Sequence, residues 1–197
     1  MFSVLVLISG SGSNLRALLE AASSPDYPAR IVAVGADREC DGLTHAEEFD
    51  IPTFVVAPSA YSSRDAWGTA LVTAIEPWMP DLVVSAGFMR ILPASTVNAL
   101  HPRLINMHPA LLPLYPGAHA VRDALVDGAQ VTGATIHVVD EGVDTGPVIR
   151  AREVAVLADD DESSLHERIK VEERQLIVET VADIARQHID LEEIARR

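Results

Sequence analysis

The alternation of short apolar runs with helix-like segments constrains the fold of this chain most strongly. Residues 2–8 are apolar and rich in β-branched side chains, which is typical of a strand covered on both faces. A last helix is predicted from about Ser164, which has capping-box spacing with Glu167. The pattern predicts strands at 2–8, 30–35, 53–57, 81–86, 103–108, 131–139 and 148–156, and earlier helices at 15–22, 43–49, 64–75 and 117–126.

This order predicts an α/β fold with a doubly wound, mostly parallel sheet of the Rossmann-like kind and helices on both faces. The strands at 131–139 and 148–156 have little chain between them, so we expect them to pair antiparallel at one edge. A length of 197 residues predicts a single domain over 1–197.

The charge balance and the N-terminus narrow the classes of partner. The chain has 29 acidic and 15 basic side chains and a net charge of −14, which repels a phosphate backbone, so we expect no nucleic-acid partner. One cysteine, Cys40, excludes an internal disulfide framework and fits a reducing compartment. The first apolar run has no basic leader and is too short to span a bilayer. We therefore expect a soluble cytoplasmic protein with no membrane partner.

A glycine-rich loop joins the first predicted strand to the first predicted helix. In residues 10–14, glycines allow a close backbone approach, and Ser13 and Asn14 add side-chain donors at a helix N-terminus, which suits a phosphate. A tight turn with capping hydroxyls is the alternative. Leu15 stands where the dinucleotide fingerprint requires a third glycine, so an NAD module, in which Asp37 would hold a ribose, matches incompletely.

Two polar side chains leave the fifth predicted strand on the same face. Asn106 and His108 are two residues apart, and Pro109 ends the strand at the sheet edge where open α/β folds bind ligands. The alternative is a histidine that satisfies a buried backbone group. Residues 137–147 form an acidic, glycine-containing loop, in which either all carboxylates are solvated or one faces the histidine.

These motifs together resemble those of the phosphoribosylglycinamide formyltransferases, folate-dependent enzymes of purine synthesis within the wider formyltransferase family. The resemblance spans nearly the whole chain. It rests on residues 10–14, 86–92, 105–109 with the Leu-Leu-Pro that follows, 115–119 and 140–147. The Asn-x-His strand and the Asp-x-Gly-Pro loop belong to the wider family, and the glycine loop and the Pro-Gly-x-His segment are more specific.

The resemblance implies transfer of the formyl group of 10-formyltetrahydrofolate, the co-substrate, to the amine of 5-phosphoribosylglycinamide, with no metal. It makes Asn106, His108 and Asp144 the catalytic residues. Attack on a formamide carbon forms a tetrahedral species with a developing oxyanion, which Asn106 and a protonated His108 would stabilise. We expect the Asp144 carboxylate to raise the pKa of His108 and to help relay a proton. Residues 1–100 would form the phosphoribosyl-binding half, and 101–197 the catalytic and folate-binding half.

The resemblance also implies the binding residues and small-molecule partners, in a monomer or homodimer. For phosphoribosylglycinamide they are Gly12, Ser13, Asn14 and Glu173. For folate they are Arg64, Met89, Arg90, Ile91, Leu92, Asn106, Asp140 and Asp144, with the 140–144 loop meeting the pterin through its backbone.

Glu173 also stands out from helical periodicity. It lies on the apolar stripe of the last predicted helix, where an unpaired carboxylate is costly. It therefore needs a partner or a cleft edge, unless it lies at the margin of the stripe and reaches water. Leu114, Lys170 and Arg174 depart from the commoner family pattern, and we hypothesise that the last two adjust phosphoribosyl affinity.

Four other functions stay open. A 10-formyltetrahydrofolate hydrolase would use water as acceptor, and a methionyl-tRNA formyltransferase would carry a further C-terminal domain. A non-catalytic nucleotide- or NAD-binding module would need only the glycine loop. A metal-dependent hydrolase would use His108, His119 and Asp144, whose spacing matches no zinc pattern.

Overall fold

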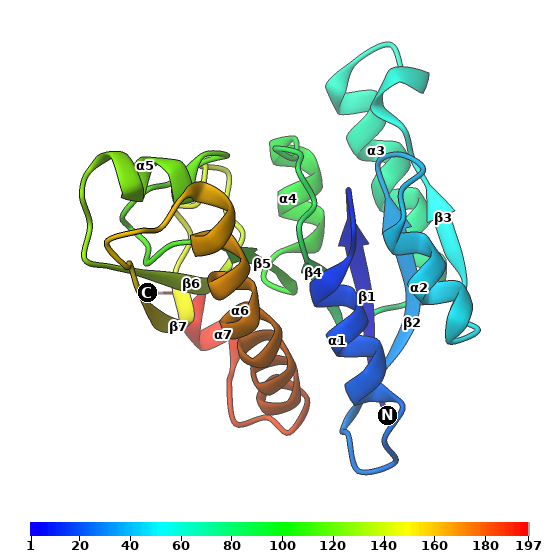
Figure 1. Cartoon of the computed structure of the whole chain (residues 1–197). Helices are drawn as coiled ribbons and strands as arrows, with labels where there is room; N and C mark the ends of the chain where they lie inside the picture. Colours follow the sequence, from blue (N-terminus) through cyan, green and yellow to red (C-terminus); the bar gives the residue numbers. More distant parts are fainter. Residues whose placement is uncertain (197) are drawn as a thin grey trace.

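The computed structural model describes residues 1–196, which are built around one seven-stranded sheet of order β3-β2-β1-β4-β5-β6-β7 (Figure 1). The first five strands along the chain pair in parallel, and β6 and β7 pair antiparallel at one edge, as predicted. The strands are β1 (Phe2–Ile8), β2 (Ala29–Ala36), β3 (Thr53–Val55), β4 (Leu82–Ser85), β5 (Leu104–His108), β6 (Val131–Val138) and β7 (Val148–Ala155).

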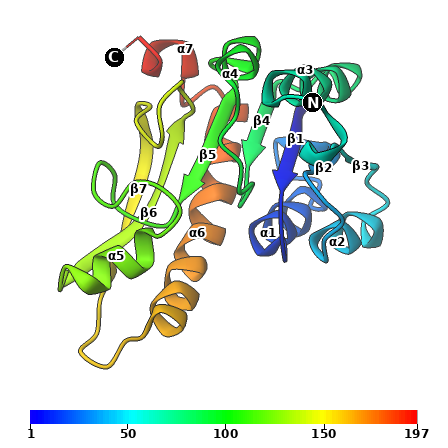
Figure 2. The ribbon, with the colours of Figure 1, turned by 90° about the horizontal axis from the view of Figure 1, so that it is seen from above.

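Helices cover both faces of this sheet, which confirms the predicted doubly wound fold. Figure 2 shows α1, α2, α5 and α6 on one face and α3 and α4 on the other. None of the helices within residues 1–196 combines the length and apolarity needed to cross a membrane. The helices are α1 (Ser13–Ala22), α2 (Gly42–Glu48), α3 (Arg64–Ile75), α4 (Ala94–Leu100), α5 (Ala120–Val126), α6 (Glu162–Ala185) and α7 (Leu191–Ile194), with short 3₁₀ turns at Pro58–Ala60 and Glu76–Trp78.

The period-2 geometry of β1 divides the hydrophobic core into two layers. Val4, Val6 and Ile8 pack in the layer under α1 and α6, whereas Leu5 and Leu7 pack in the layer under α3. All five side chains are fully buried. At about 1.5–3 kcal/mol for each large buried aliphatic side chain, this strand is a major source of the hydrophobic stabilisation.

Three helix predictions were incomplete. The helix predicted as the last one is followed by the short helix α7. The helix α4 was not predicted, because its seven residues include Ser, Thr and Asn and give a weak apolar period. The long helix α6 begins at Glu162 rather than near Ser164, and its capping box joins Asp161 to Ser164. Glu167 is instead paired with Lys170, at 2.7 Å. Thus Ser164 is not the N-cap residue that its spacing to Glu167 had predicted. Its side chain instead accepts a hydrogen bond from the backbone N–H of the N-cap residue, Asp161.

The topology places two ligand-facing segments side by side. The strand order reverses between β1 and β4, and ligands bind open sheets of this kind beyond the carboxyl ends of such strands. The loop after β1 is the glycine loop, and the segment after β4 contains residues 87–92. Ser9 connects them, since its N–H donates to Gly87 O at 3.1 Å and its hydroxyl accepts the Met89 N–H at 2.8 Å.

Candidate active site

The polar cluster at the end of β5 begins with the pleat of the strand. Ile105 and Met107 pack into the core, while Asn106 and His108 lie on the opposite face, as predicted. In the antiparallel pairing with β6, Asn106 is opposite His137 and His108 is opposite Thr135. The register therefore adds two polar side chains from β6 to the two from β5.

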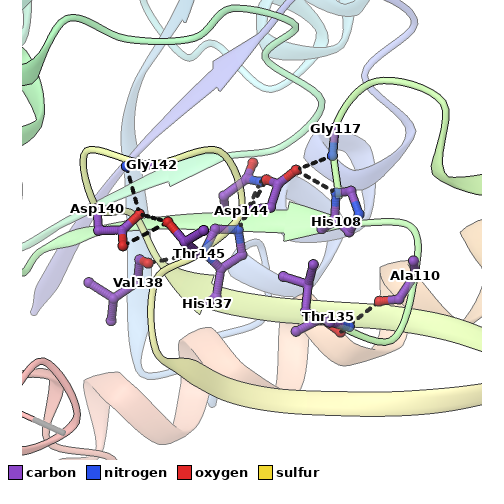
Figure 3. A network of polar contacts seen from close by, with 12 residues as sticks. His108, Ala110, Gly117, Thr135, His137, Val138, Asp140, Gly142, Asp144 and Thr145 are labelled. Carbon is purple, nitrogen blue, oxygen red and sulfur yellow. Dashed lines mark hydrogen bonds and ion pairs between the residues drawn. The ribbon is translucent and has the colours of Figure 1, made fainter. Parts of the chain in front are cut away.

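The loop between β6 and β7 returns Asp144 to this cluster (Figure 3). Asp144 adopts a left-handed conformation with φ of 53°, and its Oδ2 accepts the Gly117 N–H at 2.7 Å. The same oxygen lies 3.3 Å from His108 Nδ1, and Oδ1 accepts from Asn106 Nδ2 at 3.4 Å. The three residues named as catalytic in the sequence analysis are thus brought together.

Asp144 is held as an anion. Burial alone would raise the pKa of its carboxyl, but hydrogen bonds from His137 and Gly117 and the nearby His108 leave that pKa below its ordinary value. An ionised carboxylate only accepts hydrogen bonds. Asp144 therefore offers an anionic hydrogen-bond acceptor beside the two side chains of β5.

Both ring nitrogens of His108 face acceptors. Nε2 lies 2.8 Å from the Tyr115 carbonyl oxygen, and Nδ1 faces Asp144. Burial lowers the pKa of His108 overall. Asp144 raises that pKa as expected, and so does Tyr115, but burial outweighs both, so the expectation of a protonated His108 is wrong for the free protein. The sequence revealed the carboxylate but not the depth at which the imidazole is buried.

His137 is a member of the cluster to which the sequence analysis gave no role. Its Nδ1 lies 3.0 Å from Val138 O, and its Nε2 lies 3.2 Å from Asn106 Nδ2. The same Nε2 lies 3.5 Å from Asp144 Oδ1, so His137 lies between the amide and the carboxylate, and its ring tautomer decides which of the two it binds. The signal that could have found it is the alternation of Thr135 and His137 on a strand predicted to lie at the antiparallel edge.

The glycine loop requires a glycine at position 12. Gly12 has φ of 70°, and a Cβ there would lie 2.9 Å from the Cα of Gly42 at the start of α2. Gly42 N donates to Gly10 O at 3.0 Å, so the loop and α2 are in direct contact. Beside the loop is a pocket of about 390 Å³, lined by Ser11, Ser13, Arg16, Ala17, Glu20, His45 and Arg174.

Asn14 and Glu173 form a buried polar pair next to this loop. Asn14 Nδ2 donates to Glu173 Oε2 at 3.1 Å, and Asn14 Oδ1 has no partner among the described residues. Glu173 is only 6% exposed, which excludes the alternative of a carboxylate reaching water. Burial raises the pKa of Glu173 despite the opposing hydrogen bond from Asn14. The pair therefore offers unsatisfied acceptors to a ligand with hydroxyl groups.

A second pocket, of about 520 Å³, lies beside the segment after β4. Met89 and Ile91 are 69% and 59% exposed there, and the Arg64 guanidinium donates to the Ile91 and Leu92 carbonyls. Leu92 packs against the core under α3. The lining residues are Pro58, Tyr61, Ser63, Arg64, Trp67, Met89, Arg90 and Ile91.

Two other carboxylates are engaged within the protein. Asp140 accepts from Gly142 N and Thr145 Oγ1 and so shapes its own loop. Asp37 is buried and paired with Arg38 and Arg90, which is incompatible with the alternative role of holding a ribose. Within residues 1–196, no group of three or more His, Cys, Asp and Glu side chains is arranged to hold a metal ion.

Known proteins share both this sequence and this fold. Phosphoribosylglycinamide formyltransferase of Mycobacterium tuberculosis is 54% identical over 182 residues, which cover 92% of this chain and 84% of that protein. The Escherichia coli K12 protein of the same name is 39% identical over 175 residues, which cover 88% and 82%. The crystal structure of glycinamide ribonucleotide transformylase 1 from Symbiobacterium toebii superposes with a TM-score of 0.92 at 38% identity, and covers 95% of this chain and 89% of that one.

The family match extends across the cluster and both pockets. The sequence model of the formyl transferase family aligns with residues 2–181, from β1 to near the end of α6. It therefore includes the glycine loop, the Asn106–His108 strand, the Asp144 loop and Glu173. This chain belongs to the formyl transferase family.

Proposed function

We propose that this enzyme transfers the formyl group of 10-formyltetrahydrofolate to the amine of 5-phosphoribosylglycinamide. The convergence of Asn106, His108 and Asp144 carries the proposal, in a chain 54% identical to a protein named for that activity. A folate would supply the formyl group on N10. Every other step is assigned to side chains of this chain.

Asn106 and His108 act on the formyl oxygen. Both direct nitrogen atoms at the Asp144 carboxylate, at 3.4 and 3.3 Å, so the pair is arranged to serve an oxygen anion beside it. The contact from Asn106 is the one that a formyl oxygen would replace, which leaves His108 Nδ1 beside Asp144. Each well-placed donor to a developing oxyanion is worth about 3–4 kcal/mol of barrier lowering.

Asp144 moves the proton that the reaction releases. The attacking nitrogen forms its bond to the formyl carbon, loses a proton, and the bond from that carbon to folate N10 breaks. The lowered pKa of His108 leaves the free imidazole largely neutral near pH 7, so it can accept this proton through Asp144. The resulting imidazolium stabilises the oxyanion and then returns the proton to N10.

The ribose phosphate fits the glycine loop and α6. Gly12, Ser13 and Asn14 bring backbone and side-chain donors to the start of α1, where a phosphate is favoured. Glu173 and the unpartnered Asn14 Oδ1 would accept hydrogen bonds from ribose hydroxyls. Arg174 lines the adjacent pocket with Ser11 and Ser13, as a cation suited to the phosphate.

The folate fits the pocket between α3 and the segment after β4. The exposed side chains of Met89 and Ile91 offer apolar surface to an aromatic ring, and Arg64 brings a positive charge to the rim. Residues 140–144 supply backbone groups for a pterin, since the Asp140 side chain is occupied inside its own loop.

An acceptor-dependence assay tests the proposal. The protein is mixed with 10-formyltetrahydrofolate, with and without phosphoribosylglycinamide, and each mixture is repeated with a chelator. Loss of the formyl donor only when the amine is present, unaffected by chelator, is the expected result. Donor loss without the amine would instead identify a hydrolase, and chelator sensitivity would identify a metal-dependent reaction.

A further inference from the structure

A buried charge cluster at the end of β2 has no part in the reaction steps above. Its centre is Asp37, whose side chain has no exposed surface. Arg90 Nε lies 2.5 Å from Asp37 Oδ2, and Arg38 donates to both carboxylate oxygens at 3.1 and 3.4 Å. A fully buried carboxylate is strongly destabilising unless cations and hydrogen bonds compensate it. Asp37 therefore needs these partners to stay in place.

The two arginines differ in what they hold. Arg38 is the chain neighbour of Asp37, and its side chain is 52% exposed. Arg90 comes from 53 residues further along the chain, in the segment that follows β4 and lines the 520 Å³ pocket. The Asp37–Arg90 pair consequently ties the end of β2 to the wall of that pocket.

Other bonds of the segment converge on the same place. The Ser9 hydroxyl accepts the Met89 N–H at 2.8 Å, and Arg90 N donates to Phe88 O at 2.8 Å. Burial alone would raise the pKa of Asp37, but hydrogen bonds from Arg38, Arg90 and Ser9 hold it below its ordinary value. Ser9 and Asp37 thus hold the inner side of residues 87–92, while Arg64 holds the Ile91 carbonyl from α3.

We propose that Asp37 is a positioning residue for the formyl donor, which acts by fixing Arg90 and with it the backbone of residues 88–92. This inference rests on the proposed function, because it assigns the 520 Å³ pocket to the folate. The side chains of Met89 and Ile91 are mostly exposed, so the wall depends on its backbone anchors. Loss of the Asp37 charge loosens that wall and weakens donor binding, with little effect on chemistry once the donor is bound.

The test compares Asp37→Asn, Arg90→Gln and the double variant with wild type, and uses Arg38→Gln as the matched control. Calorimetry measures tetrahydrofolate binding, and kinetics give kcat and both KM values. We expect Asp37→Asn and Arg90→Gln to raise Kd and donor KM about five- to tenfold, by loss of a charge-assisted bond. Arg38→Gln stays within about twofold of wild type, as do kcat and the KM for the amine in all variants.

The double variant distinguishes positioning from independent effects. If Asp37 acts through Arg90, the double variant binds no more weakly than the worse single variant. Additive losses of tetrahydrofolate affinity in the double variant would overturn the inference. Equal weakening of that affinity by Arg38→Gln and Arg90→Gln would overturn it as well, and this comparison can be made even if Asp37→Asn fails to fold. Equal tetrahydrofolate affinity in every protein would overturn this inference alone. No binding by wild type would overturn the proposed function as well.

Discussion

Asn14 and Glu173 are 159 residues apart in sequence and 3.1 Å apart in space, joined by a hydrogen bond from Nδ2 to Oε2. The bond links the first turn of α1 to the middle of α6, directly beside the glycine loop. One amide hydrogen only partly compensates a carboxylate that is 6% exposed. A site that keeps such a cost in the free protein is suited to a ligand that removes it.

Glu173→Gln is expected to stabilise the free protein and weaken substrate binding. The glutamine can keep the bond from Asn14 Nδ2 and can also donate to the unpartnered Asn14 Oδ1. If removal of the buried charge raises the free energy of unfolding by ~1 kcal/mol, the Tm of a chain of this size would rise by about 2–4 °C. Loss of an anionic acceptor would raise the KM for phosphoribosylglycinamide about tenfold. Steady-state kinetics with the formyl donor at a saturating concentration measures this change.

The pH dependence gives the sign of the Glu173 effect. Because the folded pKa is raised above 4.5, wild type loses stability as the pH rises from 4.5 through that folded pKa. The Tm difference between Glu173→Gln and wild type should therefore grow over this range and be smallest below it. A variant that is less stable than wild type at neutral pH, with unchanged KM, would assign Glu173 a purely structural role.

Arg174→His is expected to raise the KM for phosphoribosylglycinamide about fivefold while kcat stays within twofold, because one charged contact to phosphate is lost. Lys170→Gln is the matched control, because the hypothesis made for both residues from the sequence is kept here for Arg174 alone. Its ammonium is already paired with Glu167 at 2.7 Å, and Lys170 does not line the 390 Å³ pocket as Arg174 does. Unchanged KM in Arg174→His, or an equal effect in both variants, would contradict a phosphate-side role for Arg174.

The sheet was predictable because its signals are local. The apolar run of β1, the loop lengths between elements and the short connection from β6 to β7 are sufficient for the strand types and the antiparallel edge. The short α4 was missed because seven residues with three polar side chains carry little period. The start of α6 was misplaced because Ser164 fits two capping-box spacings, one with Asp161 before it and one with Glu167 after it. Only the structure shows that Asp161 is its partner.

The site residues were predictable where their positions depend on the alternation of side chains along β5 or on the apolar stripe of α6. Asn106 and His108 share a face by period, and Glu173 falls on the stripe by spacing. The burial that lowers the pKa of His108, the position of His137 opposite Asn106, and the pairing of Asp37 with Arg90 depend on register and depth. Those properties arise from long-range packing, which no local pattern encodes.

Asp144→Asn tests the central claim, that this carboxylate serves the chemistry at His108. Asparagine tolerates the left-handed backbone at this position, and its Oδ1 can keep the bond from Gly117 N, so the variant should fold. It removes the charge that raises the pKa of His108 and the acceptor for the released proton.

The most direct measurement is the pH profile of kcat for wild type and Asp144→Asn, with the affinity for tetrahydrofolate measured alongside. We predict that kcat falls about 10²- to 10⁴-fold, that Kd changes by less than about threefold, and that the limb reporting His108 moves to lower pH. An unchanged kcat, or a reduced kcat with a profile identical to that of wild type, would contradict the role given to Asp144.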